Sequence, residues 1–234
     1  MWRPEGIHWD MGKRKKVVDG KLRRRFQESL LTWYAVNKRT LPWRNTADPY
    51  SILVSEIMLQ QTQVDRVIPK YEEFLQKYPT LEALASAPVD EVRQTWYPLG
   101  YNVRPLRLHS IARETVEKYG GKIPDDPEAL QSLKGIGRYT AGAMLSFAFG
   151  REAPILDTNV RRVLHRVFIG EGDAKRYSLQ KGLWELSEAL IPAGKVYDFN
   201  QALMDFGATV CTARKPVCLI CPMQDFCKAF PCTP

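Results

Sequence analysis

Four cysteines near the carboxyl end of the chain restrict its fold more than any other feature. Cys211, Cys218, Cys221 and Cys227 are spaced C-x6-C-x2-C-x5-C, and all five cysteines lie within the last 24 residues. A secreted disulfide framework spreads its cysteines along the chain, so this clustering indicates metal binding in an intracellular protein. The segment 211–227 is therefore expected to wrap a metal centre.

The spacing of these cysteines favours one kind of centre. Four cysteines also bind zinc, usually as two C-x-x-C pairs with a longer spacer between them. Here one such pair is flanked by two single cysteines, and short, uneven spacing is typical of a [4Fe–4S] cluster. We predict a [4Fe–4S] cluster, with zinc as the alternative and a chance group of free thiols as a third interpretation. Cys232 lies outside the pattern and is not expected to be a ligand.

The remainder of the chain predicts helices. Its 234 residues, 44% of them hydrophobic, suffice for one large domain or two closely packed lobes. Apolar residues recur at helical spacing, as at 183, 186 and 190, and no convincing strand pattern appears. Asp48-Pro49 and Asp126-Pro127 read as N-caps followed by proline in the first helical turn. An all-α fold with short connections is expected, after a basic, loosely ordered tail over residues 1–24.

The charge of the chain favours a polyanionic partner. A net charge of +8 suits nucleic acid, although a basic protein without such a partner would carry the same charge. Much of the excess lies in 13–16 and 21–25, and Met11 is an alternative start to Met1. No apolar run is long enough to span a membrane, and the amino terminus does not resemble a signal peptide. An intracellular protein, in cytoplasm or nucleoid, is expected.

A Gly-x-Gly turn joins two helical patterns at 133–142. Gly135 and Gly137 allow a tight turn with exposed N–H groups, and the helix that follows favours an anion at its N-terminus. A dinucleotide site would need a preceding strand and a third glycine, where Thr140 stands. The turn therefore suits a DNA phosphate held without sequence preference. Taken alone the signal is weak, because glycines are common between helices.

Two carboxylates stand out from their surroundings. Glu56 shares a predicted helix face with Ile52 and Leu53, where burial would raise its pKa and make it a general acid. The competing interpretation is a glutamate that reaches solvent or forms a structural ion pair. Asp157 precedes a basic helix and reads first as an N-cap, whose bonds from N–H groups keep it ionised. Two carboxylates in different environments are the pattern for acid-assisted glycosidic cleavage. Next to Glu56, the amides of Gln60 and Gln61 can reach base edges.

These residues carry a family resemblance. The chain resembles the helix-hairpin-helix DNA glycosylases of the endonuclease III superfamily, and among them most closely the adenine DNA glycosylases. The resemblance covers about four-fifths of the chain, from about 41 to 227. Its motifs are LPWR at 41–44, SEIMLQQTQV at 55–64, LGY at 99–101, GIGRYTAGA at 135–143, ILDTNVRRVL at 155–164 and FNQALMDFGA at 199–208, with the cysteine loop.

The resemblance implies a fold and a role for each of the predicted site residues. Two α-helical lobes would flank a DNA-binding cleft, one of six helices over about 47–150 and one from 25–46 with 151–210, with the cluster loop at 211–227. Glu56 would protonate the flipped base, Asp157 would stabilise the sugar cation, and both would face the cleft. The implied catalytic residues are Glu56, Asp157, Tyr139 and Asn159. The implied DNA- and base-binding residues are Trp43, Arg44, Leu59, Gln60, Gln61, Tyr101, Lys134, Gly135, Gly137 and Arg138.

Bifunctional relatives carry a lysine where Tyr139 stands, so the resemblance implies a monofunctional enzyme. The expected partner is double-stranded DNA containing a mismatch or lesion, and a monomer is expected by default. Adenine opposite guanine or 8-oxoguanine is the expected target.

Departures from the family pattern keep a second target open. The chain as given ends at Pro234, without the C-terminal domain that checks for 8-oxoguanine in adenine glycosylases. Thr158 stands where those enzymes have glycine, and Asn102 where they have a second aromatic residue. These features resemble the short thymine or uracil mismatch glycosylases, which act on T·G or U·G. A DNA-binding scaffold without catalysis is the alternative from another class of function.

Overall fold

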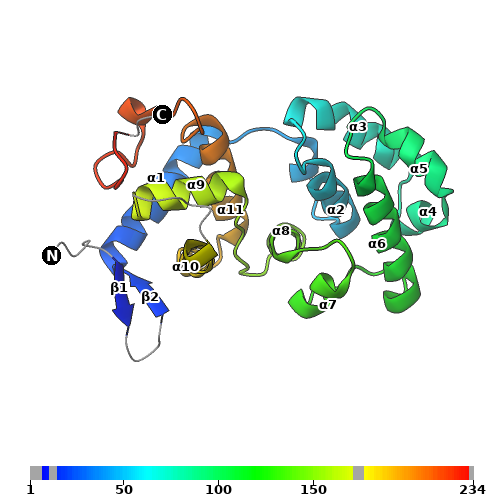
Figure 1. Cartoon of the computed structure of the whole chain (residues 1–234), viewed down its shortest axis with the longest axis horizontal. Coiled ribbons are helices and arrows are strands. Elements are labelled where there is room, and N and C mark those ends of the chain that lie inside the picture. The colour runs from blue at the N-terminus through cyan, green and yellow to red at the C-terminus, as the bar shows by residue number, and fades with distance from the viewer. Residues whose placement is uncertain (1–6, 11–14, 171–176, 232–234) are drawn as a thin grey trace. The chain divides into compact units, whose positions relative to one another are not determined.

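The computed structural model describes residues 7–10, 15–170 and 177–231. Its contacts divide the chain into two compact units, one of residues 1–39 with 152–234 and the other of residues 40–151. The helical prediction is confirmed, because helices dominate both units (Figure 1). The boundary differs from the expected one, since residues 40–46 belong with the second unit and not with the amino-terminal helix.

The unit of residues 40–151 contains seven α-helices where six were expected. It begins with the 3-10 helix η1, Pro42–Arg44. The α-helices are α2 (Pro49–Met58), α3 (Val64–Lys77), α4 (Leu81–Ser86), α5 (Val89–Trp96), α6 (Val103–Tyr119), α7 (Pro127–Ser132) and α8 (Arg138–Phe147). Two predicted N-caps are confirmed: Asp48 accepts hydrogen bonds at the start of α2, and Asp126 does so at the start of α7.

Helix α2 lies at the centre of this unit. It contacts α3, α6 and α8, and it buries Tyr50 and every residue from 52 to 58. The helix is therefore buried around most of its circumference rather than along one stripe, which is the pattern of a helix enclosed by others. Edge-to-face packing of Phe74 with Tyr78 and Trp96, at ring distances of 4.9 and 5.9 Å, fills the space between α3 and α5.

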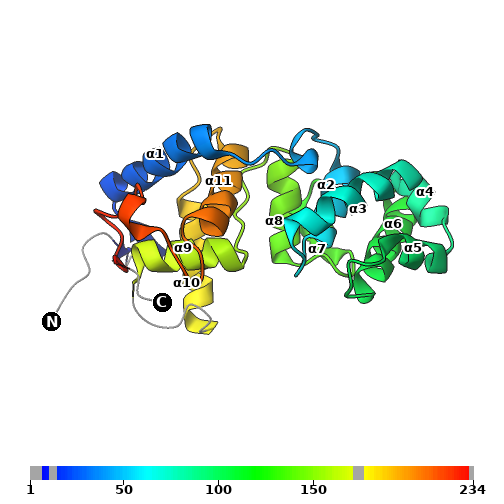
Figure 2. The same ribbon diagram turned by 90° about the horizontal axis from the view of Figure 1, so that it is seen from above.

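The other unit combines the two ends of the chain. It contains the strands β1 (Ile7–Asp10) and β2 (Lys15–Val18), the helices α1 (Gly20–Asn37), α9 (Thr158–Phe168), α10 (Tyr177–Ala189) and α11 (Val196–Thr209), and the 3-10 helix η2 (Cys218–Ile220). Helix α11 contacts both α1 and α9 (Figure 2). At their meeting point the ring of Phe26 packs edge-to-face on Phe168 and Phe199, at 4.9 and 6.2 Å.

The expectation of a loosely ordered tail over residues 1–24 is wrong for its described part. β1 and β2 form an antiparallel hairpin, which also departs from a strictly all-α fold. β2 contacts α10, and Val18 is 6% exposed. Helix α1 starts at Gly20, because Asp19 accepts hydrogen bonds from the N–H groups of Lys21 and Leu22. Packing against α10, which is remote in sequence, was not visible in the residues of the tail. Among the described residues, no helix is long and apolar enough to cross a membrane.

Candidate functional site

The predicted site residues fall into two groups, one in each unit. The unit of residues 40–151 holds Trp43, Arg44, Glu56, Leu59, Gln60, Gln61, Tyr101, Lys134, Gly135, Gly137, Arg138 and Tyr139. The other unit holds Asp157, Asn159 and the four cysteines. Each group is built by local capping and by packing within its own unit.

Glu56 is buried on α2, with only 4% of the residue exposed. Helix α2 carries it inward because the neighbouring residues Ser55 and Ile57 are also buried, at 1% exposure each. The interpretation that this glutamate merely reaches solvent at the margin of the helix is therefore wrong. A carboxyl group removed from water in this way is a suitable proton donor to a bound molecule.

The chain turns sharply directly after α2. Leu59 and Gln60 are half-buried, whereas Gln61 is exposed and has a left-handed backbone with φ of 55°. Trp43, on η1, is 7% exposed and packs edge-to-face on Tyr71 at 5.5 Å. The predicted base-binding residues therefore differ in exposure: Trp43 is buried, Arg44, Leu59 and Gln60 are half-buried, and Gln61 is exposed.

Tyr101 occupies a second exposed turn, before α6. Its residue is 57% exposed, and its φ of 49° is again left-handed. Gln61 and Tyr101 are the two non-glycine residues with positive φ among the described residues. Such backbone is disfavoured for side chains with a Cβ and concentrates at functional positions.

The Gly-x-Gly turn forms the helix-hairpin-helix element α7–turn–α8. Gly135 has φ of 114°, which only glycine adopts readily, and Gly137 is the N-cap of α8. Gly137 supplies no side chain to cap that helix, while Leu133 and Ile136 anchor the turn in the core. Lys134, Gly135, Gly137 and Arg138 are exposed and Tyr139 is half-buried. The start of α8 therefore presents backbone N–H groups and two cations to solvent, an arrangement that suits phosphate.

Asp157 is the N-cap of α9, as the sequence predicts. Its Oδ1 accepts a hydrogen bond from the Val160 N–H at 2.6 Å, and its Oδ2 accepts one from the Asn159 amide at 3.1 Å. As expected, these bonds favour the charged form, but they do not act alone. Burial raises the pKa of Asp157 above its ordinary value, and the bonds from Val160 and Asn159 offset only part of that rise.

Thr158, which departs from the family pattern, causes no backbone strain. It is the first residue of α9, is exposed and does not have a positive φ. The glycine expected from the family would therefore have no special conformational role here. The departure leaves the cap at Asp157 intact.

Arg162 was missed as a site residue by sequence reasoning. Its Nη2 donates to Asn159 Oδ1 at 2.8 Å and to the Gly207 carbonyl at 2.6 Å, and its Nε donates to the Cys211 carbonyl at 2.7 Å. Hydrogen bonds thus connect Asp157 through Asn159 and Arg162 to a cysteine. The one available signal was the 3.6-residue period, which places Arg162 one turn after Asn159.

Gly207 was also missed, and its role is close packing. A Cβ at this position of α11 would lie 2.8 Å from Asn159 Cβ, closer than real Cβ contacts. Glycine therefore lets α11 approach the first turn of α9. Its carbonyl receives the hydrogen bond from Arg162, so this approach also helps to hold Asn159 beside Asp157.

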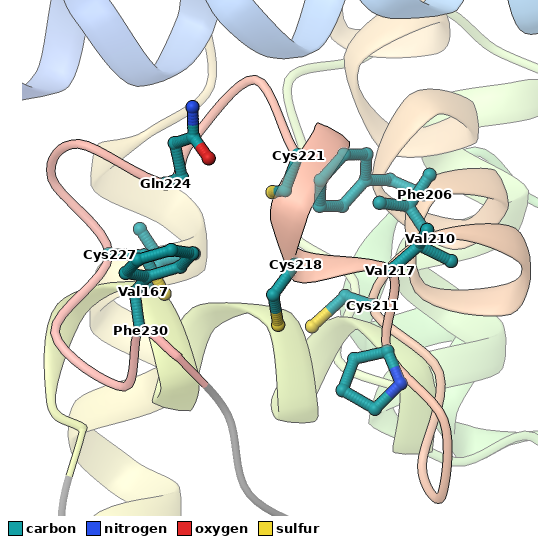
Figure 3. Close-up of a pocket in the computed structure, with 11 residues that line it drawn as sticks. Val167, Phe206, Val210, Cys211, Val217, Cys218, Cys221, Gln224, Cys227 and Phe230 are labelled. Atoms are coloured by element: carbon teal, nitrogen blue, oxygen red, sulfur yellow. The ribbon is translucent and has the colours of Figure 1, made fainter.

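The four predicted cysteines line one pocket in the unit that contains α9 and α11. Its lining includes Cys211, Cys218, Cys221 and Cys227 with the apolar side chains of Val167, Phe206, Val210, Val217 and Phe230. Figure 3 shows the sulfur atoms of Cys211 and Cys218 pointing toward one another. No three His, Cys, Asp or Glu side chains of the described residues are arranged to hold a single metal ion. The loop therefore presents four thiols around a shared apolar pocket, not a closed coordination sphere.

The surroundings of the cysteines suit thiolate ligands. Arg166 Nη1 lies 3.6 Å from Cys211 Sγ, and the Met223 N–H donates to Cys221 Sγ at 3.4 Å. Burial raises the pKa of the Cys221 thiol to about 11, so a thiolate there requires the positive charge of a bound metal centre. Hydrogen bonds to sulfur from Arg166 and backbone are the usual means of tuning an iron–sulfur cluster. The residues present therefore fit the predicted cofactor. Cys232 lies outside the described residues.

Comparison with known families decides what this architecture is. Residues 54–189 match the model of the HhH-GPD superfamily base excision DNA repair proteins. The chain belongs to this family. Residues 211–227 match the iron-sulfur binding domain of endonuclease III, the segment predicted from cysteine spacing. The match selects the [4Fe–4S] cluster over the zinc alternative.

Individual relatives in the family have two kinds of printed name. The adenine DNA glycosylase of Homo sapiens is 47% identical over 87% of this chain and 39% of its own length. The thymine/uracil-DNA glycosylase of Methanothermobacter thermautotrophicus is 39% identical over 90% of this chain and 95% of its own length. The chain thus spans about two-fifths of the mammalian relatives that it matches.

Solved structures confirm the fold of the family. A thermostable thymine-DNA glycosylase superposes with a TM-score of 0.84 at 38% identity, covering 90% of this chain and 97% of its own. Endonuclease III trapped in a covalent complex with DNA superposes with a TM-score of 0.77 at 23% identity, covering 91% and 97%. At that lower identity the likeness concerns the fold alone.

Proposed function

We propose that this chain is a base-excision DNA glycosylase that hydrolyses the N-glycosidic bond of adenine opposite guanine or 8-oxoguanine. The observation that carries the proposal is the contrast between two carboxylates. Glu56 is buried among the residues of α2, whereas Asp157 caps α9 and accepts a hydrogen bond from the side-chain amide of Asn159. Carboxylates in such different environments can serve as acid and as charge stabiliser in one glycosidic cleavage.

The two carboxylates have separate roles in the proposed reaction. The target base leaves the duplex stack, because its glycosidic bond is inaccessible within it. Glu56 protonates the base, which makes the base a better leaving group as the bond to C1′ breaks. Asp157, as a carboxylate, stabilises the positive charge that develops on the sugar, and Asn159 keeps its Oδ2 in place. Water then completes hydrolysis and leaves an abasic site.

Tyr139 favours a monofunctional reaction. A glycosylase that also cleaves the DNA strand uses an amine to form a Schiff base with the sugar. Tyr139 offers a hydroxyl group at the position where bifunctional relatives carry that lysine. We therefore expect strand breakage only after alkali treatment, and no covalent adduct when borohydride is present.

Most of the groups to which we assign DNA binding lie in the unit formed by residues 40–151. The N-terminus of α8, with Lys134 and Arg138, would hold a backbone phosphate without reading the sequence. Gln61 and Tyr101, both exposed on left-handed turns, would enter the stack beside the target. Trp43, Arg44, Leu59 and Gln60 would surround the flipped base. The cluster, when bound, would hold the conformation of the cysteine loop. That loop carries Arg214 and Lys215, two further exposed cations that would be available to DNA phosphates.

A thymine or uracil mismatch glycosylase is the second candidate. It is favoured by the thymine/uracil-DNA glycosylase relative, which this chain matches over 95% of that protein's length. Thr158 fits α9 without strain, so the residue that departs from the adenine glycosylase pattern is compatible with either activity. The same two carboxylates would serve both reactions, so base choice has to be measured.

The deciding experiment is single-turnover cleavage of five duplexes, followed by alkali treatment. They contain A·8-oxoguanine, A·G, T·G, U·G and a matched pair. We expect cutting at A in the first two duplexes. Cutting at T or U opposite G would instead establish the second candidate. A protein that binds these duplexes and cuts none of them would be a scaffold, and the enzyme proposal would be wrong.

A matched pair of variants assigns the acid. Glu56→Gln removes the proton donor while retaining shape, and should reduce the single-turnover rate by at least about 100-fold, as expected for a lost general acid. Duplex binding should persist. Glu72→Gln makes the same chemical change at an exposed position of α3 and should cleave normally. Equal rates for the two variants would exclude Glu56 as the acid.

A further inference from the structure

Arg104, in the first turn of α6, is a buried cation without a carboxylate partner in the described part of the chain. The residue is 3% exposed, and burial lowers the pKa of its guanidinium. Burying a charge without an opposite charge is costly unless polar groups surround it. Arginine is suited to that situation because its planar fork makes several hydrogen bonds at once. The hydrogen bonds that this guanidinium makes are therefore expected to have a specific role in the fold.

One nitrogen of the guanidinium holds the end of α2. Nη1 donates to the carbonyl oxygens of Ile57, Met58 and Gln60, at 3.3, 2.7 and 2.5 Å. The last carbonyls of a helix have no partner within it, and they attract positive charge. Arg104 thus supplies the donors that this helix end lacks, and it reaches the residue directly before Gln61.

The other terminal nitrogen holds the turn before α6. Nη2 donates to the carbonyl oxygens of Leu99 and Gly100, at 3.2 and 3.1 Å, and to Thr62 Oγ1 at 2.9 Å. The guanidinium also lies over two aromatic rings, 5.4 Å from the centre of Trp96 and 5.2 Å from that of Tyr101. One side chain therefore joins two turns that lie about 40 residues apart in the sequence.

These two turns contain the two non-glycine residues of the unit that have left-handed backbone. Gln61 directly follows the carbonyl of Gln60, and Tyr101 directly follows that of Gly100, both bound by Arg104. Backbone in this region is sterically disfavoured and persists only when its surroundings determine it. The hydrogen bonds of Arg104 hold the backbone conformation of both turns, whereas the side chains of Gln61 and Tyr101 remain exposed.

We propose that Arg104 is a positioning residue that holds Gln61 and Tyr101 together as a preformed pair of duplex-opening side chains. Preforming the pair means that its ordering is completed during folding rather than on contact with DNA. Arg104 touches neither the target base nor the sugar in this proposal and acts only through the two turns. The inference rests on the proposed function for the role of the pair, but its structural half can be tested without DNA.

The DNA-independent test is amide hydrogen exchange of the free protein. Arg104→Lys keeps the charge but cannot bind six acceptors. Exchange of the Thr62 and Leu99 amides, which donate to the Leu59 and Trp96 carbonyls in the two turns, should therefore rise together, by roughly tenfold. The matched control is Arg66→Lys. Arg66 donates to the Pro98 carbonyl at 2.8 Å, in the same turn, but it does not reach Gln61. Unchanged exchange, or an equal rise throughout 40–151, would overturn the proposal.

A double-mutant cycle tests whether Arg104 acts through the pair. Arg104→Lys should lower single-turnover cleavage about tenfold in the wild-type background, and not further in a Gln61→Ala/Tyr101→Ala background. A merely structural role would lower the rate equally in both backgrounds and would sink the idea. Thr62→Val removes one of the hydrogen bonds of Arg104 and should lower the cleavage rate by a smaller factor. This variant replaces Arg104→Lys in the cycle if Arg104→Lys does not fold. If the wild-type protein cleaves no duplex, the proposed function is what fails, and exchange alone decides the role of Arg104.

Discussion

The side-chain amide of Asn159 lies 3.1 Å from Oδ2 of Asp157 and donates a hydrogen bond to it. The same side chain accepts a hydrogen bond from Arg162 through its Oδ1, so the amide cannot rotate without losing a partner. This orientation matters because only the NH2 end stabilises a carboxylate. The pair explains how a partly buried aspartate can still carry negative charge when the sugar becomes positive.

Asn159→Ala should therefore impair catalysis and shift its pH dependence. Loss of the amide removes a bond that lowers the pKa of Asp157, so that pKa should rise further above its ordinary value. The acid side of the pH–rate profile should move to higher pH, and the rate near pH 7 should fall roughly tenfold or more. Single-turnover rates across pH measure both effects. Thr158→Ala, at an exposed neighbouring position, should leave the profile unchanged.

Asp157→Asn should abolish cleavage and stabilise the protein. Because the folded-state pKa of Asp157 is raised, the folded state binds the proton more tightly than the unfolded state does. The contribution of Asp157 to the free energy of unfolding is therefore complete at pH values below the ordinary aspartate pKa. It is lost as the pH rises through the raised pKa of the folded state. Asparagine keeps the Oδ1 acceptor of the N-cap but places an NH2 group where the Asn159 amide donates to Oδ2. Removal of the buried charge outweighs the loss of that hydrogen bond, so the net gain at neutral pH should be less than about 1 kcal/mol. Urea unfolding at pH 4 and pH 8 should show the gain only at pH 8, and a variant less stable than wild type at pH 8 would contradict this reasoning.

Gly207→Ala should disturb the catalytic end of α9. The new Cβ would lie 2.8 Å from Asn159 Cβ, so the two helices must separate. Overpacking of this kind costs about 1–3 kcal/mol, and cleavage should fall because Asn159 shifts relative to Asp157. Thermal unfolding and single-turnover rates measure the two effects. Gly20→Ala is the control, because its nearest neighbour, Arg24, is 3.9 Å from the added Cβ. Normal activity in Gly207→Ala would show that the contact is not needed.

Cys218→Ser should remove the iron–sulfur cluster or make it labile. The variant should lose the visible absorption of the brown holoprotein and the stability that the bound cofactor contributes. Iron and sulfide analysis with a melting curve measures this. Cys232→Ser is the matched control and should retain full iron content, because Cys232 lies outside the spacing of the four ligands. Equal iron loss in both variants would refute the predicted ligand set.

Features that depend on neighbours in the sequence could be predicted from it. Asp48, Asp126 and Asp157 cap helices as expected, because the atoms that they bind lie two or three residues away. The four cysteines lie within 17 residues, so any compact loop brings them to one pocket. The glycine turn before α8 could also be predicted from neighbouring residues, because Gly135 adopts a backbone conformation that other residues avoid.

Features that depend on distant segments were decided by the tertiary structure. Arg104 binds carbonyls 44 to 47 residues before it, and Arg162 binds one 49 residues after it. A charged residue in a helix gives no sign in the sequence that its partners are backbone oxygens elsewhere. The burial of Asp157 likewise depends on many residues, and its effect on the pKa of Asp157 outweighs that of the local hydrogen bonds, which favour the charged form. Local hydrogen bonds follow from residue order, whereas desolvation and long-range contacts exist only once the helices have packed.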